Sequence, residues 1–165
     1  MDTKTIIVTL VTDRTQADVE RVRELAAKGF AAMTAEEQAE WLAGMKGAYN
    51  ASDLNRVGTA LNYLAGRLDA ICGRSIAWTA KTDWAATDII TASQAEEYRK
   101  QVQSIRDALA YPAGTPDAPQ LGRLTYTDAN NIERILKLCE DLIVNVAKSF
   151  RHTGAAECAA GGLLT

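Results

Sequence analysis

Few side chains in this sequence have the types and the spacing that catalysis needs. The only histidine, His152, follows Arg151 near the end of a predicted helix, and Cys158 is the nearest thiol. A nucleophile and its base must lie within hydrogen-bond reach of each other. A cation at the end of a helix is also favoured by the helix dipole, and this explains His152 without catalysis. We therefore predict no enzyme and no catalytic residues, with a small enzyme built around His152 as the remote alternative.

Acidic and sulfur-bearing side chains give no recognisable metal site. Asp53 and Asp128 each stand in the predicted first turn of a helix, where an acid interacts favourably with the helix dipole. They would form a paired-carboxylate site only if their two helices faced each other. The three cysteines, Cys72, Cys139 and Cys158, have no C-x-x-C spacing, and the first two are expected to be buried free thiols. We predict no metal and no cofactor.

Two tryptophans offer the one candidate for ligand recognition. Trp78 and Trp84 lie in the segment Arg74–Ala92, which has no helical periodicity and includes Lys81 and Asp83. Aromatic faces beside such a charged pair suit a carbohydrate or a partner surface. The alternative is that the two rings seal one end of a helical bundle under a long covering segment. A carbohydrate- or cell-surface-binding module is therefore the second functional hypothesis.

Composition limits the class of protein. The chain has 165 residues and a net charge of −3, with its lysines and arginines scattered, so a basic nucleic-acid-binding face is not expected. No run of 18 apolar residues is present, so no membrane-spanning helix is expected. The first residues also lack the basic start of a secretory signal. The length suits one domain with a sizeable core.

The stretch Ala48–Leu68 predicts a central amphipathic helix. Ser52 is the expected N-cap, and the apolar positions that follow step by three and four residues, which places them on one stripe. Those positions are Leu54, Val57, Leu61, Leu64, Leu68 and Ile71. A strand would scatter them over two faces, so we predict a buried helix.

Further helices are predicted from their caps. Thr15 with Asp18, Thr34 with Glu37, and Ser93 with Glu96 have the spacing of capping boxes. The last and longest helix is expected from Thr127 to about Arg151. The predicted fold is mainly α, a bundle of about five capped amphipathic helices with a short N-terminal β-strand. The predicted organisation is a strand or docking segment over residues 1–14, the helical bundle over 15–153, and a small-residue C-terminal tail over 154–165.

Two of these helices repeat one pattern. Aligning Ser52 with Thr127 also pairs Asp53 with Asp128 and Leu61 with Leu136. Two explanations are equally good. Any two capped amphipathic helices have similar residues at similar positions, or the two helices belong to related helical hairpins about a pseudo-twofold axis. Either explanation gives a helical bundle.

The segment Thr5–Thr12 is β-branched and apolar, which favours a strand. Ile6, Val8 and Leu10 would share one face, and no other segment of the chain is an equally strong strand. A hydrophobic edge without a partner invites pairing with another chain. We therefore predict that this segment mediates assembly into a homo-oligomer or a larger complex.

Several segments together point to a family. The stretches LVTDRTQADVERV, MTAEEQAEWLAGMKGAYNASDLNRVGTALNYLA, TAKTDWAATDIITASQAEEYRKQV and LTYTDANNIERIL resemble small helical proteins and domains encoded by phages and prophages of Gram-positive gut bacteria, among their virion structural genes. The resemblance runs from about Leu10 to Phe150, and KGAYNASDLNRVG and KTDW are its most specific parts. It implies a non-enzymatic virion component associated with the tail, a fibre or the baseplate. Such a component is made in the host cytoplasm and contacts copies of itself and other virion proteins. The family provides no catalytic residues to transfer.

Overall fold

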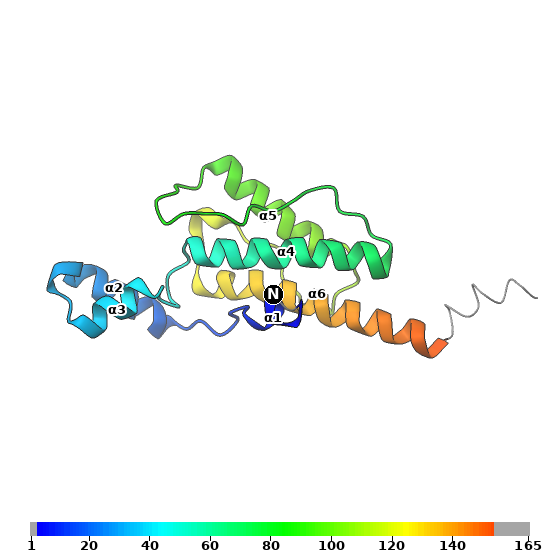
Figure 1. Ribbon diagram of the computed structural model, residues 1–165, viewed down its shortest axis with the longest axis horizontal. Coiled ribbons are helices and arrows are strands. Elements are labelled where there is room, and N and C mark those ends of the chain that lie inside the picture. Colours follow the sequence, from blue (N-terminus) through cyan, green and yellow to red (C-terminus); the bar gives the residue numbers. More distant parts are fainter. Residues whose placement is uncertain (1–2, 154–165) are drawn as a thin grey trace, which may run out of the picture.

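The protein is a bundle of helices with a helical hairpin projecting from one end (Figure 1). The computed structural model describes residues 3–153, and the side chains of residues 6–150. Its α-helices are α1 (Thr3–Val8), α2 (Gln16–Lys28), α3 (Ala35–Leu42), α4 (Ala51–Cys72), α5 (Ala92–Asp107) and α6 (Tyr126–Thr153). Two 3₁₀ turns, η1 (Phe30–Ala32) and η2 (Leu121–Arg123), complete the regular structure. The mainly helical fold is therefore as predicted.

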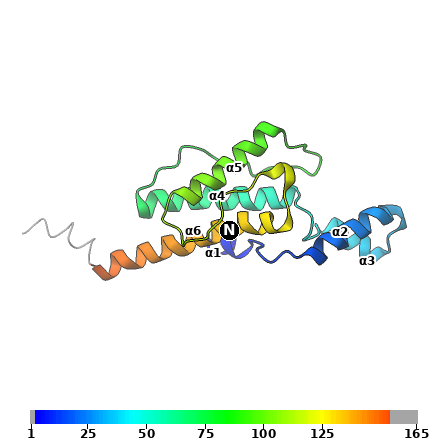
Figure 2. The same cartoon turned by 180° about the vertical axis from the view of Figure 1, so that it is seen from behind.

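The bundle consists of α4, α5 and α6, and α4 lies beside α6 in both views (Figures 1 and 2). The predicted stripe of α4 forms its centre, because Val57, Leu61, Leu64 and Leu68 are all fully buried. Burial of each such side chain contributes roughly 1.5–3 kcal/mol. The residues of α5 and α6 that complete this core are Tyr98, Val102, Ile105, Ile132, Ile135, Leu136, Cys139 and Ile143.

The hairpin has a small hydrophobic core of its own. Leu25, Met33 and Met45 are buried together, with Val22 and Trp41 packed against them. We call this projecting unit, residues 16–45, the arm. Its outer surface carries ion pairs such as Arg21 with Glu40. The arm is thus held together separately from the bundle core.

The predicted N-terminal strand is not found. Residues Thr3–Val8 form the short helix α1, which packs on α4 and α6. A helix satisfies its backbone hydrogen bonds internally, whereas a strand needs a partner, and the described residues contain no strand. Ile6 packs against the bundle core and Leu10 is buried there. Of the three residues predicted for assembly, only Val8 is exposed, at 78%.

The capping predictions are partly right. The Thr15–Asp18 and Thr34–Glu37 boxes form as expected. The cap of α4 is Asn50 with Asp53, rather than Ser52, because Asp53 accepts from the Asn50 backbone N–H at 2.9 Å.

The remaining two caps are also displaced by two residues. Thr91 with Gln94 caps α5 in place of Ser93 with Glu96, and Glu96 pairs with Arg99 instead. In the same way, Asp128 of α6 accepts from the backbone N–H and the hydroxyl of Thr125. The displacement is equal in α4 and α6, so the predicted alignment of the two helices keeps its register. Their pseudo-twofold symmetry stays a prediction.

The long segment between α4 and α5 covers α4. Asn55 donates to the Trp84 carbonyl oxygen at 2.8 Å and accepts from the Trp84 N–H at 2.7 Å. Asn62 makes the same two bonds with Ala80, at 2.9 and 2.7 Å. Gly58 lies under the segment, since a Cβ there would collide with the Lys81 carbonyl oxygen. The segment is therefore a packed cover fixed by two asparagines that lie two turns apart on α4.

Candidate functional site

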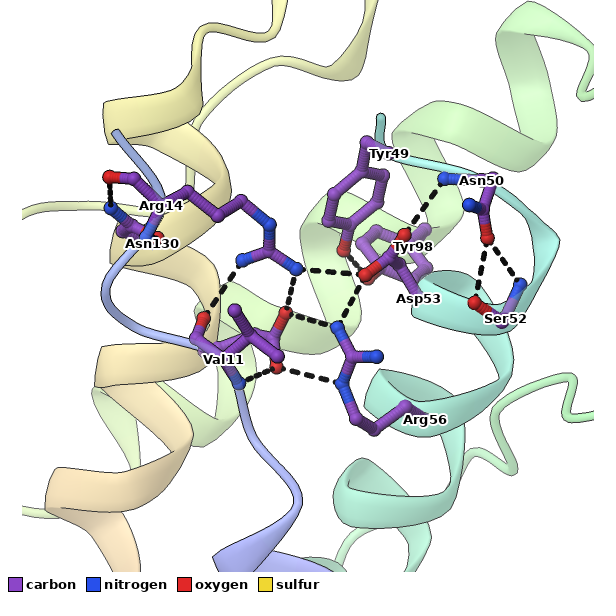
Figure 3. A network of polar contacts seen from close by, with 10 residues as sticks. Val11, Arg14, Tyr49, Asn50, Ser52, Asp53, Arg56, Tyr98 and Asn130 are labelled. Atoms are coloured by element: carbon purple, nitrogen blue, oxygen red, sulfur yellow. Dashed lines mark hydrogen bonds and ion pairs between the residues drawn. The ribbon is translucent and has the colours of Figure 1, made fainter. Parts of the chain in front are cut away.

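Four charged side chains meet inside the protein, where the chain before α2 crosses the beginnings of α4 and α6 (Figure 3). Arg14, Asp53 and Glu133 are 4%, 6% and 0% exposed, and Arg56 is half-buried. Burying a charge costs several kcal/mol unless it is paired. Two cations and two anions are present, so the charges balance. We call these four residues the charge cluster.

The cluster is closely connected. Arg14 Nη2 donates to Asp53 Oδ1 at 2.7 Å and to Glu133 Oε1 at 2.6 Å. Arg56 donates to Glu133 through Nη2 at 2.7 Å and through Nε at 3.0 Å, and it also pairs with Asp53. The two contacts between Arg56 and Glu133 form a bidentate pair, which is the strongest geometry for such groups.

The cluster also fixes the chain before α2. The Val11 N–H donates to Glu133 Oε2 at 2.6 Å, and Arg14 Nη1 donates to the Val11 carbonyl oxygen at 2.8 Å. Asn130 of α6 holds the backbone of Arg14 in the same way, accepting from its N–H and donating to its carbonyl oxygen, both at 2.9 Å. The chain that leads into the arm is thereby held against α6.

Two tyrosines close one side of the cluster. The hydroxyls of Tyr49 and Tyr98 are 2.5 Å apart, and the Arg14 guanidinium lies 5.6 Å from the centre of the Tyr49 ring. Burial raises the pKa of both hydroxyls above the ordinary tyrosine value, so both stay protonated at neutral pH. The pair extends the polar contacts from the cluster to α5.

This geometry stabilises the fold and leaves little freedom for chemistry. Both oxygens of Glu133 accept hydrogen bonds from within the protein, and its side chain has no exposure to a substrate. Asp53 has the predicted first-turn position and is also an ion-pair partner. Asp128 instead caps its own helix through Thr125, so the two acids serve different contacts.

Sequence reasoning missed Arg14, Arg56 and Glu133. One signal was present, because Glu133 stands four residues after Ala129 and three before Leu136, on the buried stripe of α6. A charged residue at such a position requires a buried partner. The sequence could not name that partner.

The two tryptophans are not displayed on an open surface. Trp84 is 8% exposed, and Lys81 Nζ lies 4.4 Å from the centre of its ring. Trp78 is half-buried against the core, and its indole N–H donates to Ser104 Oγ at 2.9 Å. The two rings pack against different helices, Trp78 on α5 and Trp84 beside the start of α4, and they form no shared stacking platform.

A groove of about 830 Å³ lies at the base of the arm. Its walls come from the arm, the beginning of α4 and the covering segment. Leu42 lines it while being 74% exposed, and Asp88, which lines it as well, pairs with Lys81 at 3.4 Å. The other lining residues are mostly apolar: Val22, Trp41, Ala43, Gly44, Met45, Ala48, Tyr49, Asn50, Ala51, Ser52, Leu54, Asn55, Trp84, Ala85, Ala86 and Ile90. We call this hollow the arm groove.

Within the described part of the chain, no group of three or more His, Cys, Asp or Glu side chains is placed to hold a metal ion. No helix there is long and apolar enough to cross a membrane. His152 belongs to the last turn of α6, and the predicted Cys158 lies outside the described residues.

The fold and the site define a small helical bundle with a balanced internal charge cluster and a projecting arm. Comparisons with known proteins add no family to this description: no family model matches the chain, and no curated protein or solved structure gives a significant match.

Proposed function

We propose that this protein is a non-enzymatic structural component of phage virions, associated with the tail, a fibre or the baseplate, and that it acts through protein–protein assembly. The observation that carries the proposal is the arm groove. Its lining is mostly apolar and includes a leucine that is 74% exposed, at the base of a unit that projects from the bundle. Exposed apolar surface of this kind is typical of interaction sites.

The charge cluster supports the same proposal. Its side chains bind one another and the chain before α2, which fixes the arm's connection to the bundle. Arg14 Nε is buried without a hydrogen-bond partner, but the Arg14 Nη atoms and the carboxylates of the cluster are bonded. Buried polar networks connected in this way rigidify the structure around them. A rigid arm loses little conformational entropy when it binds a partner, and this favours affinity.

The segments that most specifically resemble virion proteins contribute residues to the charge cluster and to the covering segment. The segment KGAYNASDLNRVG contains Tyr49, Asn50, Asp53, Asn55 and Arg56, and KTDW contains Trp84. In the structure these residues contribute to the charge cluster, the α4 cap and the anchor of the covering segment. The resembling segments are therefore those that position the arm and form the base of the arm groove.

Purified particles provide the test. An antibody raised against the recombinant protein should label virions from an induced strain that carries the gene, at the tail, a fibre or the baseplate, in immunogold electron microscopy. The protein should also remain with density-purified particles in proportion to the tail proteins. Absence from particles of a strain that synthesises the protein would contradict the proposal.

The carbohydrate-binding alternative is tested separately. A glycan array probed with the recombinant protein should show no binding, because neither Trp78 nor Trp84 stands open on the surface. Specific binding that is lost in Trp78→Ala would favour a cell-surface-binding module instead.

A further inference from the structure

We infer that a second pocket, between the arm and the start of α6, binds a phosphate group, carried either by free phosphate or by a small phosphate ester. The pocket has a volume of about 280 Å³, and its polar lining includes Arg14, Gln16 and Arg23. It shares one lining residue, Tyr49, with the arm groove. We call this hollow the arginine pocket. A ligand site here is independent of the proposed assembly.

Arg14 brings a buried donor without a partner to this pocket. The residue is 4% exposed, and its Nη atoms donate to the Val11 carbonyl oxygen, Asp53 and Glu133. Its Nε is buried and has no hydrogen-bond partner. Figure 3 shows Nη1 turned toward Val11 and Nε on the edge of the guanidinium toward Tyr49, which also lines the pocket. A buried donor left unpaired is unfavourable, so an acceptor that enters the pocket supplies the contact that the protein lacks.

Arg23 provides a second cation on the wall of the pocket. Gln16, Val19 and Arg23 are spaced by three and four residues, so they share the face of α2 that lines the pocket. Arg23 is exposed and forms no hydrogen bond or ion pair with any other described residue. Its neighbour on the chain, Arg21, is by contrast engaged by acidic side chains of the arm. The guanidinium of Arg23 is therefore available to a ligand.

Two helices also begin at the arginine pocket. Gln16 is the first residue of α2, Tyr126 is the first residue of α6, and both line the pocket. Backbone N–H groups in the first turn of a helix have no partner within the helix. The same end of the helix carries a partial positive charge, and the two effects together favour phosphate. Two such ends meet here beside the unpaired Arg14 Nε.

The charge balance of the pocket favours an anion. The charge cluster is neutral as a whole, so Arg23 and the two helix N-termini add positive potential that the cluster does not cancel. Among the described residues, no acidic side chain lines the pocket. Asp18 and Asp128 offset part of the two helix dipoles, but their oxygens already accept from the caps of their own helices.

The arrangement suits a phosphate group better than a carboxylate. Donors come from two arginines and from two helix N-termini on different sides of the pocket, and a phosphate ester offers three free oxygens where a carboxylate offers two. Val19, Leu124 and Ala129 line the rest of the pocket and provide apolar contact for a small organic group. Because α2 belongs to the arm and α6 to the bundle, a bound phosphate group would join the two.

Isothermal titration calorimetry of the full-length protein tests the inference. The probes are inorganic phosphate, phenyl phosphate and benzoate, compared near neutral pH at constant ionic strength. We expect both phosphate probes to bind and benzoate to bind far more weakly. Tighter binding of phenyl phosphate than of inorganic phosphate would identify the ligand as an ester, whereas equal or weaker binding of the ester would identify it as free phosphate.

Two variants place the phosphate in this pocket. Arg23→Gln removes an exposed cation and should weaken binding about tenfold or more, the effect of losing one charge-assisted hydrogen bond. Gln16→Glu should weaken it as well, because it adds a negative charge to the pocket. An acid in the first turn of a helix interacts favourably with the helix dipole, so this variant should stay folded.

Each variant has a matched control. Arg134 is an exposed arginine of α6 outside the pocket, and Arg134→Gln should leave binding unchanged. Ser93 is exposed in the first turn of α5, and Ser93→Glu adds the same acid to a helix start that does not line the pocket. Circular dichroism should show that all four variants keep their helices. Saturating phenyl phosphate should also slow amide hydrogen exchange in the first turns of α2 and α6.

Three results would overturn the inference. These are the absence of binding by both phosphate probes, benzoate that binds as tightly as phenyl phosphate, and Arg23→Gln that binds phosphate as tightly as the unaltered protein. None of them bears on whether purified particles contain the protein, so the proposed function is judged by its own experiment.

Discussion

Arg14 and Glu133 form an ion pair at 2.6 Å across 119 residues of sequence, with neither side chain more than 4% exposed. Arg14 belongs to the chain that enters the arm, and Glu133 belongs to the buried face of α6. Their contact therefore joins the beginning of the chain to its last helix. Because Glu133 also accepts from the Val11 N–H, the same carboxylate holds both the side chain and the backbone of this crossing.

Removing one member of this pair should be strongly destabilising. Arg14→Met leaves Glu133 and Asp53 with Arg56 as their one remaining cation, and the free energy of unfolding should fall by about 3 kcal/mol or more. Glu133→Gln should have a similar cost. The double variant should lose less than the sum, with a coupling of about 0.5–3 kcal/mol in urea denaturation. Strict additivity would show that the pair contributes no mutual stabilisation.

An exposed ion pair in the arm serves as the comparison for the buried pair of Arg14 and Glu133. Arg21 pairs with Glu24 and Glu40 on the surface, where solvent screens the interaction. Arg21→Ala should therefore change the free energy of unfolding far less than Arg14→Met does.

These contacts also show where prediction from the sequence ends. The stripe of α4 from Val57 to Leu68 was predictable, because a repeat of three and four residues is a local signal of one buried helical face. The charge cluster was not, since Arg14 meets Asp53 across 39 residues and Glu133 across 119. No periodicity connects such positions.

The strand predicted for the N-terminal segment was wrong for a related reason. Its β-branched residues favour a strand, but propensity is a weak preference that tertiary packing overrides. In a helix, Ile6 and Ile7 pack on the bundle without needing a strand partner. Most of the segment that was expected to pair with another chain therefore packs on the bundle core. The groove between the arm, α4 and the covering segment could not be predicted from any pattern in the sequence.

Two glycines of α4 should respond in opposite ways to alanine. At Gly58 a Cβ would collide with the Lys81 carbonyl oxygen, so Gly58→Ala should displace the covering segment and destabilise the protein by about 1–3 kcal/mol. At Gly66 a Cβ would meet nothing within 4 Å, so Gly66→Ala should stabilise the helix by about 0.5–1 kcal/mol. Thermal unfolding of both variants tests this. Equal effects would contradict the close approach of the segment to Gly58.

The displaced cap of α5 can be verified directly. Thr91 accepts from the Gln94 N–H, so Thr91→Ala should cost about 0.5–2 kcal/mol. Ser93, which was the cap predicted from sequence, is exposed within the first turn, and Ser93→Ala should be within about half a kcal/mol of neutral. Denaturant midpoints that reverse this order would restore the sequence-based assignment.

Cys139 should be chemically silent in the folded protein. Burial raises the pKa of its thiol from 9.0 to about 11, so it stays protonated and inaccessible at pH 8. Alkylation followed by mass spectrometry should modify the half-buried Cys72 well before Cys139.

The raised pKa of Cys139 also determines the direction in which stability changes with pH. Between pH 9 and 11 the unfolded chain loses the Cys139 proton while the folded protein keeps it, so the stability associated with the thiol is lost as pH rises through this window. The stability advantage of the unaltered protein over Cys139→Ala should accordingly narrow from pH 9 to 11. An advantage that widens over this range would contradict the buried neutral thiol.

The separate cores of the arm and the bundle should give the protein two levels of local stability. Leu25 and Leu136 are both fully buried leucines, but Leu25 lies in the cluster of the arm and Leu136 in that of the bundle. Each Leu→Ala change removes roughly 2–5 kcal/mol of packing and transfer free energy from its own cluster. In Leu25→Ala, amide hydrogens of α2 and α3 should exchange faster while those of α4 and α6 keep their protection. In Leu136→Ala, protection should fall across the bundle.

Because the arm groove is shared between the arm and α4, Leu25→Ala should also weaken assembly while the bundle stays folded. Uniform loss of protection in both variants would show that the arm and the bundle unfold as one unit.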